Sequence, residues 1–207
     1  MKKLLPAAFA LLLVLAGCRG GKNEESQDPE GWIRTEPTEL EMRPVDDFAN
    51  RWMALAVGKG EDLNAMTIAW GSIGNLWGKP VLIVYVSKDR FSKDLMDSND
   101  SFTVTRFPEE RRYKDALVYL GSHSKKDDPD KVAASGLTVE LTESGNAIFA
   151  EGDLAIECRK LYSDEFKADL LPESLREGLY EEMGMHSFYI GEITGVWQKG
   201  STPEEAQ

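Results

Sequence analysis

The sequence is poor in the residues on which protein-based catalysis and disulfide scaffolds depend. Its 207 residues contain 2 cysteines and 2 histidines. So few soft ligands do not make a zinc site unless many carboxylates join them. The signatures GxSxG, HExxH and the Walker loop are also absent. The sequence indicates neither a catalytic side chain nor a metal centre, and a redox role would have to use a bound cofactor.

Basic residues and long apolar runs are scarce as well. There are 24 Lys and Arg residues against 36 Asp and Glu residues, which gives a formal net charge of −12. Nucleic acids and anionic lipids bind to basic patches, so this balance favours neither as a partner. The apolar run at residues 6–16 is shorter than the roughly 20 residues that a membrane-spanning helix needs.

The beginning of the chain has the pattern of an export signal. A basic start at Lys2 and Lys3 precedes the apolar run, and Leu15-Ala-Gly-Cys18 resembles the lipobox of bacterial lipoproteins. The resemblance implies cleavage before Cys18, lipidation of Cys18 and a membrane-anchored lipoprotein outside the cytoplasm, in the periplasm or at the cell surface. Loss of the two lysines takes the net charge from −12 to −14. The alternative is an ordinary signal peptide with an incidental cysteine.

With Cys18 lipidated, Cys158 has no partner for an intrachain disulfide. The sequence around Cys158 alternates as a strand does, which favours a buried structural thiol over a reactive one. Length and a hydrophobic content of 42% suit one globular domain. We expect a signal peptide at 1–17, a tether and lead-in at 18–44, the domain at 45–199 and a flexible tail at 200–207.

Periodicity predicts many short strands interrupted by a few helices. Strands are expected at 51–57, 66–70, 80–86, 101–107, 138–141, 147–150, 154–162 and 187–197. Short helices are expected at 44–50, 91–98, 109–120 and up to residue 134, with a glycine-rich loop at 71–78 and partly helical structure at 164–184. This order predicts a mainly β fold with α insertions, arranged as a β-barrel.

The segment 64–107 holds three unusual features. Asn64-Ala-Met-Thr67 places small polar groups on a strand, the pairs Trp70-Gly71 and Trp77-Gly78 bracket the glycine-rich segment, and Arg90-Phe-Ser-Lys93 brings two cations and a hydroxyl together. Aromatic and glycine residues suit a flat ring, and cations with hydroxyls suit a phosphate. The segment therefore indicates a site for an aromatic ligand that carries a phosphate.

The order of these motifs resembles the flavin reductase family, whose fold is the FMN-binding split β-barrel. The resemblance covers residues 52–197 and continues through the motifs Trp77-Gly-Lys-Pro80, Asp100-Ser-Phe-Thr-Val104, Leu120-Gly-Ser-His-Ser124, Asp130-Lys131 with Gly136-Leu137, and Glu157-Cys-Arg-Lys-Leu161. It implies FMN as the cofactor, a homodimer whose interface helps to wall the flavin site, and hydride transfer from NADH or NADPH to the flavin.

The resemblance and the chemistry of FMN together give thirteen candidate cofactor-binding residues. Five would line the flavin ring: Met66, Thr67, Ala69, Trp70 and Gly71. Four would hold the phosphate: Ser87, Arg90, Ser92 and Lys93. Three more form a second set at the ribityl or phosphate end, Ser122, Ser124 and Lys131, and Asn64 stands at the entrance to the strand.

Other interpretations of these residues stay open. Trp70 and Trp77 could be core or dimer-interface aromatics, Arg90 and Lys93 solvated surface charges, and Asn64 the cap of a turn. His123 lies between two serines, where a hydrogen-bonding role is commoner than proton donation, and His186 has no polar cluster beside it.

Export would separate the flavin from the cytosolic NADH and NADPH that family members use. An electron-transfer flavoprotein without nucleotide turnover is therefore the alternative function. A barrel that binds another apolar ligand is the third.

Overall fold

The computed structural model describes residues 29–199. The predicted signal peptide, the lipidation site Cys18 and the predicted tail at 200–207 lie outside the described residues. No helix within residues 29–199 is long and apolar enough to cross a membrane.

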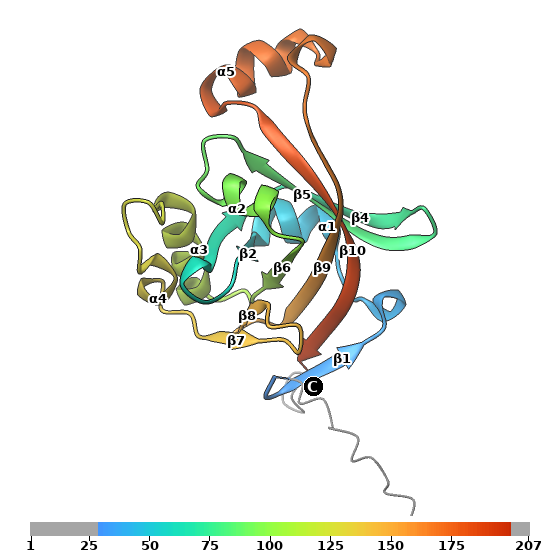
Figure 1. The fold of residues 1–207 in the computed structure, drawn as a ribbon, viewed down its shortest axis with the longest axis vertical. Helices are drawn as coiled ribbons and strands as arrows, with labels where there is room; N and C mark the ends of the chain where they lie inside the picture. Colours follow the sequence, from blue (N-terminus) through green and yellow to red (C-terminus); the bar gives the residue numbers. More distant parts are fainter. Residues whose placement is uncertain (1–28, 200–207) are drawn as a thin grey trace, which may run out of the picture.

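Antiparallel strands dominate the structure, as the sequence predicts (Figure 1). The strands are β1 (Trp32–Thr35), β2 (Met53–Val57), β3 (Asn64–Ile68), β4 (Gly71–Leu76), β5 (Lys79–Ser87), β6 (Ser101–Arg106), β7 (Val139–Leu141), β8 (Ala147–Phe149), β9 (Leu154–Glu165) and β10 (His186–Lys199). The main sheet runs in the order β3-β2-β6-β9-β10-β5-β4, with β1 added to β10, while β7 and β8 form a separate pair. The sheet curls around one core without closing, so the predicted split barrel is confirmed.

The long strand β10 organises the barrel. It pairs with β9 along its length, with β5 at its beginning and with β1 at its end. Two shifts of register interrupt the β9–β10 pairing, one at Gly191 and one near Gly195. A Cβ atom on Gly191 would lie 2.6 Å from Cys158 Cβ and 2.7 Å from the Phe102 ring. Glycine is therefore required where this strand bends over the core.

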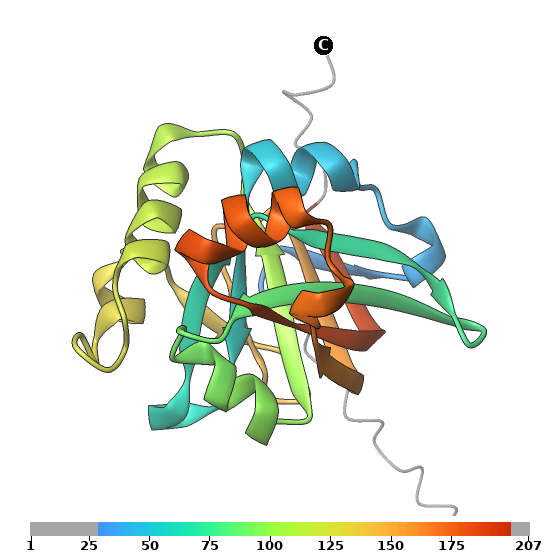
Figure 2. The ribbon, with the colours of Figure 1, turned by 90° about the horizontal axis from the view of Figure 1, so that it is seen from above.

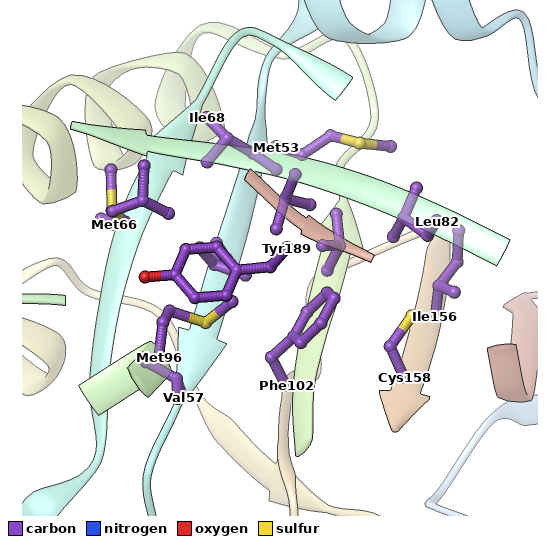
Figure 3. Packing of buried hydrophobic residues seen from close by; sticks show 14 of the residues in the cluster. Met53, Val57, Met66, Ile68, Leu82, Met96, Phe102, Ile156, Cys158 and Tyr189 are labelled. Atoms are coloured by element: carbon purple, nitrogen blue, oxygen red, sulfur yellow. The ribbon is translucent and has the colours of Figure 1, made fainter. Parts of the chain in front are cut away.

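Alternating side chains of the strands fill the barrel (Figure 3). Met53, Leu82, Phe102 and Tyr189 point into this core and are almost completely buried. Burying a side chain of this size is worth about 1.5–3 kcal/mol, so the core supplies most of the driving force for folding. Cys158 lies in the same cluster with no exposed surface, and burial raises the pKa of its thiol. The predicted structural role of this cysteine is confirmed.

The helices are short, apart from one. They are α1 (Pro44–Asp46), α2 (Ser92–Ser98), α3 (Arg111–Ser122), α4 (Lys131–Ala134) and α5 (Tyr180–Met183), with helical turns η1 (Pro37–Glu39), η2 (Asp47–Arg51), η3 (Gly60–Asp62), η4 (Ala168–Leu170) and η5 (Leu175–Leu179). The apolar spacing that predicts a helix at 109–120 corresponds to α3, which buries Tyr113, Ala116, Leu117 and Leu120. This face packs against β2 and β3 and so covers one open edge of the barrel.

Two predictions about the framework are wrong. The expected loop at 71–78 is the strand β4, which pairs with β5 and projects with it from the barrel as a hairpin (Figure 1). Its tight turn has positive φ at Trp77 (55°) and Gly78 (73°), the geometry of a two-residue hairpin turn. Trp77 is 64% exposed at this tip, so its interpretation as a core residue is also wrong.

The lead-in at 32–44 was expected to stay outside the core. Instead, β1 pairs with β10, and Trp32 is buried against Ile148, Ala155 and Trp197. The local sequence does not predict this strand, because the strand is buried only by pairing with a partner more than 150 residues away.

The connection between β9 and β10 forms an arm, which we define as residues 166–185. It leaves the sheet after Glu165, contains η4, η5 and α5, and returns at His186, where the backbone N–H of Phe166 donates to His186 O at 3.1 Å. Figure 1 shows the arm projecting beyond the end of the barrel, and Figure 2 shows it lying across the strands from above. The arm positions two residues of the site described next.

Candidate ligand-binding site

Two adjoining pockets lie along β3, beside the end of β5 and the C-terminal end of the arm. The wide cleft has a volume of about 500 Å³ and contains Met66, Thr67, Trp70, Tyr85, Met183 and His186. The narrow pocket has a volume of about 90 Å³ and contains Asn64, Ser92, Ser122, Ser124 and Lys131. Met66, Asp89 and Arg90 line both pockets, which makes them parts of one elongated site.

The wide cleft has aromatic and thioether groups in its walls, together with the charged residues Asp89, Arg90 and Glu182. The rings of Trp70 and His186 lie 4.8 Å apart between centroids, and Tyr180 meets His186 edge-on at 5.7 Å. Met66 reaches the cleft from the barrel core, since it is 8% exposed and belongs to the buried cluster (Figure 3). Aromatic and thioether groups suit a planar ring system, and a cleft of this size is typical for a small cofactor.

His186 is held as the neutral imidazole. Its Nδ1 lies 3.2 Å from Gly184 O, and the ring is buried. Burial lowers the pKa of His186, the hydrogen bond to Gly184 raises it, and the positive charge of Arg90 lowers it. Because Nδ1 must carry the proton to donate to a carbonyl, Nε2 is left as an acceptor.

The narrow pocket is polar, with a buried floor at Asn64, Ser92 and Lys131 and an exposed rim. Asn64 Nδ2 donates to Ser92 Oγ at 2.8 Å, which fixes the entrance of β3 against the start of α2. Asn64 is 1% exposed and its Oδ1 has no hydrogen-bond partner within the described residues. A buried amide oxygen without a donor costs free energy unless a ligand or water supplies one. Asn64 therefore does more than cap a turn.

Lys131 is the principal buried cation of this pocket. It is 2% exposed, and its Nζ donates to Leu120 O at 3.0 Å and to His123 O at 2.7 Å. Burial and then the positive charge of Arg90 lower the pKa of Lys131 to about 8, while Asp128 opposes the shift. Two of its three N–H donors are used, so one is left for a ligand in the pocket.

Arg90 lies where the two pockets meet. Its Nη1 donates to Gly121 O at 2.7 Å, and its charge acts on both Lys131 and His186. Arg90 and Lys131 thus satisfy carbonyl groups at the C-terminal end of α3, which is a structural role in itself. The positive charge of Arg90 lowers the pKa of the buried Lys131, and an added anion in this hydroxyl-lined pocket would stabilise the Lys131 ammonium.

The structure brings together eleven of the thirteen residues proposed from the sequence. Six line the wide cleft: Met66, Thr67, Ala69, Trp70, Ser87 and Arg90. Five more line the narrow pocket: Asn64, Ser92, Ser122, Ser124 and Lys131. These residues come from segments up to 67 residues apart, and the structure joins them into one continuous surface. Their assignment to a cofactor stays a prediction.

Gly71 and Lys93 lie outside the lining of both pockets. A Cβ atom on Gly71 would lie 2.1 Å from the Phe48 ring, so packing against Phe48 explains this glycine. Lys93 Nζ pairs with Asp97 Oδ2 at 2.5 Å and with Glu165 Oε1 at 4.0 Å. Its ammonium therefore serves a surface ion-pair network on α2.

Sequence reasoning missed several lining residues. Tyr85, Asp89, Glu182, Met183 and His186 all contribute to the wide cleft. His186 becomes a site residue because it pairs with Ser87 across the β5–β10 register. No local pattern around residue 186 indicates this, since the partner strand lies about 100 residues earlier in the chain.

Solved structures with the same fold are flavoproteins. They include a flavoredoxin from Methanosarcina acetivorans, 22% identical, with a TM-score of 0.56, covering 80% of this chain and 74% of that chain. An FMN-binding protein from Thermus thermophilus with bound 1-cyclohex-2-enone is 20% identical, with a TM-score of 0.57 and coverage of 84% and 86%. An NADH:FAD oxidoreductase from Streptomyces globisporus is 17% identical, with a TM-score of 0.53 and coverage of 72% and 75%. At these identities the similarity establishes the fold, which is that of the FMN-binding split-barrel flavoproteins.

No protein-family model matches the sequence, and no curated protein is significantly similar to it.

The residues of the site fit a phosphorylated flavin. The wide cleft offers flat walls for the ring system, and the narrow pocket offers hydroxyl groups and the cations Arg90 and Lys131 for the phosphate. The unpaired amide oxygen of Asn64 is an acceptor and would suit a hydroxyl of the ribityl chain rather than the phosphate. The volumes agree with a ring system in the cleft, which is about 500 Å³, and a phosphate in the pocket, which is about 90 Å³.

Proposed function

We propose that this chain is an FMN-binding flavin oxidoreductase. The observation that carries the proposal is the continuity, through Met66 and Arg90, of an aromatic cleft with a polar pocket that holds the buried Lys131. When bound, the flavin supplies reversible two-electron chemistry, and the protein binds and orients it. Lys131 and Arg90 would hold the phosphate, whereas Trp70 and Met66 would lie against the ring.

Two variants separate the phosphate site from ordinary surface charge. Arg90→Ala removes a cation from the narrow pocket, and Lys93→Ala removes one that is paired with Asp97 on α2. We expect the purified protein to be yellow or to take up FMN, with an affinity that falls at least about tenfold in Arg90→Ala, as expected for a charge-assisted hydrogen bond. Lys93→Ala should leave the affinity within about threefold of the wild type.

The measurement is quenching of flavin fluorescence during titration with apoprotein, with riboflavin as the ligand that lacks the phosphate. Arg90→Ala should change riboflavin binding little. A colourless protein that takes up no added FMN would contradict the proposal. Equal losses of FMN affinity in both variants would contradict the assignment of the phosphate to the narrow pocket.

NADH and NADPH are the first candidates for the electron donor, as the family resemblance implies. Anaerobic addition of either nucleotide should then bleach the absorbance of the bound flavin. The second candidate function is electron transfer without nucleotide turnover. The carboxylates of Asp89 and Glu182 at the wide cleft favour it, because they would repel the phosphates of a dinucleotide. It predicts a flavin that dithionite reduces and that neither nucleotide reduces.

A homodimer is part of the proposal. Tyr85, Phe166, Phe188 and Tyr162 form a row of ring contacts on the outer face of β5, β9 and β10, with centroids 5.6 to 6.1 Å apart. Tyr162 is 45% exposed although it belongs to this apolar row. A partner subunit that covers the row would bury it and wall the neighbouring cleft. Analytical ultracentrifugation should show a dimer, and Tyr162→Glu should weaken it.

We also propose lipid anchoring through Cys18, on the motif Leu15-Ala-Gly-Cys18 alone. The mature chain should then be extracytoplasmic and should partition into detergent. Cys18→Ala should release it from membranes, and mass spectrometry of the mature N-terminus gives an independent measurement.

A further inference from the structure

The arm at residues 166–185, with the two residues that precede it, is strongly acidic. Residues 164–183 contain seven carboxylates and two cations, which gives a net charge of −5. One of the two cations, Arg176, forms an ion pair with Glu177 at 3.4 Å. Just after the end of β5, Lys88 pairs with Glu165 at 2.6 Å. The side of the site formed by the arm therefore carries uncompensated negative charge.

This charge reaches the wide cleft. Asp89 and Glu182 belong to its lining, and Arg90 is the one Lys or Arg among the described residues that line it. Arg90 Nη1 is directed to Gly121 O, toward the narrow pocket. A pyrophosphate needs cations or free backbone N–H groups, so a dinucleotide that enters over the arm meets carboxylates instead.

The same wall is aromatic where it approaches the cleft. Phe166 stacks on Tyr85 with centroids 5.8 Å apart and planes inclined by 15°, and it also contacts Tyr180 at 6.4 Å. Tyr180 in turn meets His186. These contacts hold the base of the arm against the cleft and leave a surface on which an uncharged ring can stack.

We propose that the acidic arm makes the wide cleft selective for planar, uncharged ring compounds of the quinone class and excludes dinucleotides as redox partners. The inference rests on the proposed flavin site and on the second candidate function, in which no nucleotide reduces the flavin. In such a reaction an electron-transfer protein would supply two electrons, and solvent two protons, to the flavin. The quinone would then take up the same two electrons and two protons and leave as the hydroquinone.

Charge reversal on the arm tests the selectivity. Glu181→Lys with Glu182→Lys reverses two charges in α5, next to the cleft. Asp169→Lys with Glu173→Lys reverses two exposed charges farther along the arm, outside the lining of the cleft. The FMN-loaded full chain is titrated with NADP⁺ by calorimetry at low and at high salt. We expect NADP⁺ to bind the first variant about tenfold or more tightly than the wild type at low salt, and the gain to disappear at high salt.

The control variant should bind NADP⁺ within about threefold of the wild type, because its charges lie farther from the cleft. Menadione, an uncharged quinone, should reoxidise the dithionite-reduced flavin anaerobically at similar rates in the wild type and in the control variant, whose substitutions lie outside the lining of the cleft. Equal NADP⁺ affinity in the wild type and in the first variant overturns the inference, as does an equal gain in the control. A wild-type flavin that NADPH reduces overturns it too, as does one that menadione does not reoxidise. A chain that retains no FMN contradicts the proposed function before any titration with nucleotide.

Discussion

The pH dependence of FMN binding is the sharpest consequence of the narrow pocket. Burial and Arg90 lower the pKa of Lys131 to about 8 in the free protein. A bound phosphate dianion stabilises the ammonium and raises that pKa again. FMN binding therefore takes up a proton above pH 8, so affinity is retained below this pH and is lost as the pH rises through it.

The magnitude follows from the fraction of Lys131 that carries its charge. With a pKa of about 8, the ammonium is about 90% populated at pH 7 and about 10% at pH 9. The apparent Kd for FMN should therefore rise about tenfold between these two pH values, as long as the pKa in the complex lies above 9. Lys131→Met should weaken FMN binding at pH 7 by about 1.5–3 kcal/mol, the value of a charge-assisted hydrogen bond, and should abolish the pH dependence.

Fluorescence titration with FMN and with riboflavin measures both effects. Riboflavin has the same ring system without the phosphate. Any change of riboflavin affinity with pH should therefore come from the ring system alone and should be the same in the wild type and in the variant. Lys131→Met leaves the carbonyls of Leu120 and His123 without this donor, so circular dichroism must show that the variant is folded. An FMN affinity that changes no more with pH than that of riboflavin would refute the reasoning.

Two further predictions concern the framework that holds the site. Gly71→Ala should lower the free energy of unfolding by about 1–3 kcal/mol, because the new Cβ overlaps the Phe48 ring, whereas Gly74→Ala has open space at its Cβ and should be nearly neutral. Urea denaturation compares the two, and equal effects would contradict the packing argument. Asp47→Ala should lower the free energy of unfolding by about 3–5 kcal/mol, because Asp47 is 1% exposed and pairs with two largely buried arginines. Asp115→Ala on the exposed face of α3 should cost less than about 1 kcal/mol, and thermal unfolding of both variants measures the difference.

Local sequence predicted the elements of the barrel where periodicity is strong. The apolar run that became β5 and the amphipathic spacing of α3 are both local patterns, and both elements are confirmed within two residues. The prediction failed at β4, whose glycines and single apolar residues resemble a loop, and at β1, which is only 4 residues long. Both strands form because a neighbouring strand offers free backbone groups for hydrogen bonding. The local sequence does not show that such a neighbouring strand exists.

The residues of the candidate site were likewise predicted in part from local sequence and decided in part by the tertiary structure. Asn64, Arg90 and Lys131 could be proposed from motifs, because the residue types themselves indicate an anion and a flat ligand. The motif Arg90-Phe-Ser-Lys93 does not indicate, however, which of its two cations belongs to the site. Arg90 reaches Gly121 and the narrow pocket, while Lys93 pairs with Asp97 one turn along α2. The direction of a long side chain depends on what packs around it, so only the structure could distinguish them.

The sequence by itself determined that the chain is a mainly β protein without a metal or nucleophile motif, with a segment at 64–107 suited to a phosphorylated ring, because residue type and spacing carry that information. The tertiary structure decided that this segment forms a site at all. It placed Lys131 beneath the end of α3, brought His186 against Trp70 and set the acidic arm beside the cleft. These contacts join residues from 11 to more than 110 positions apart, and the long-range pairings are selected by the shared core of the barrel.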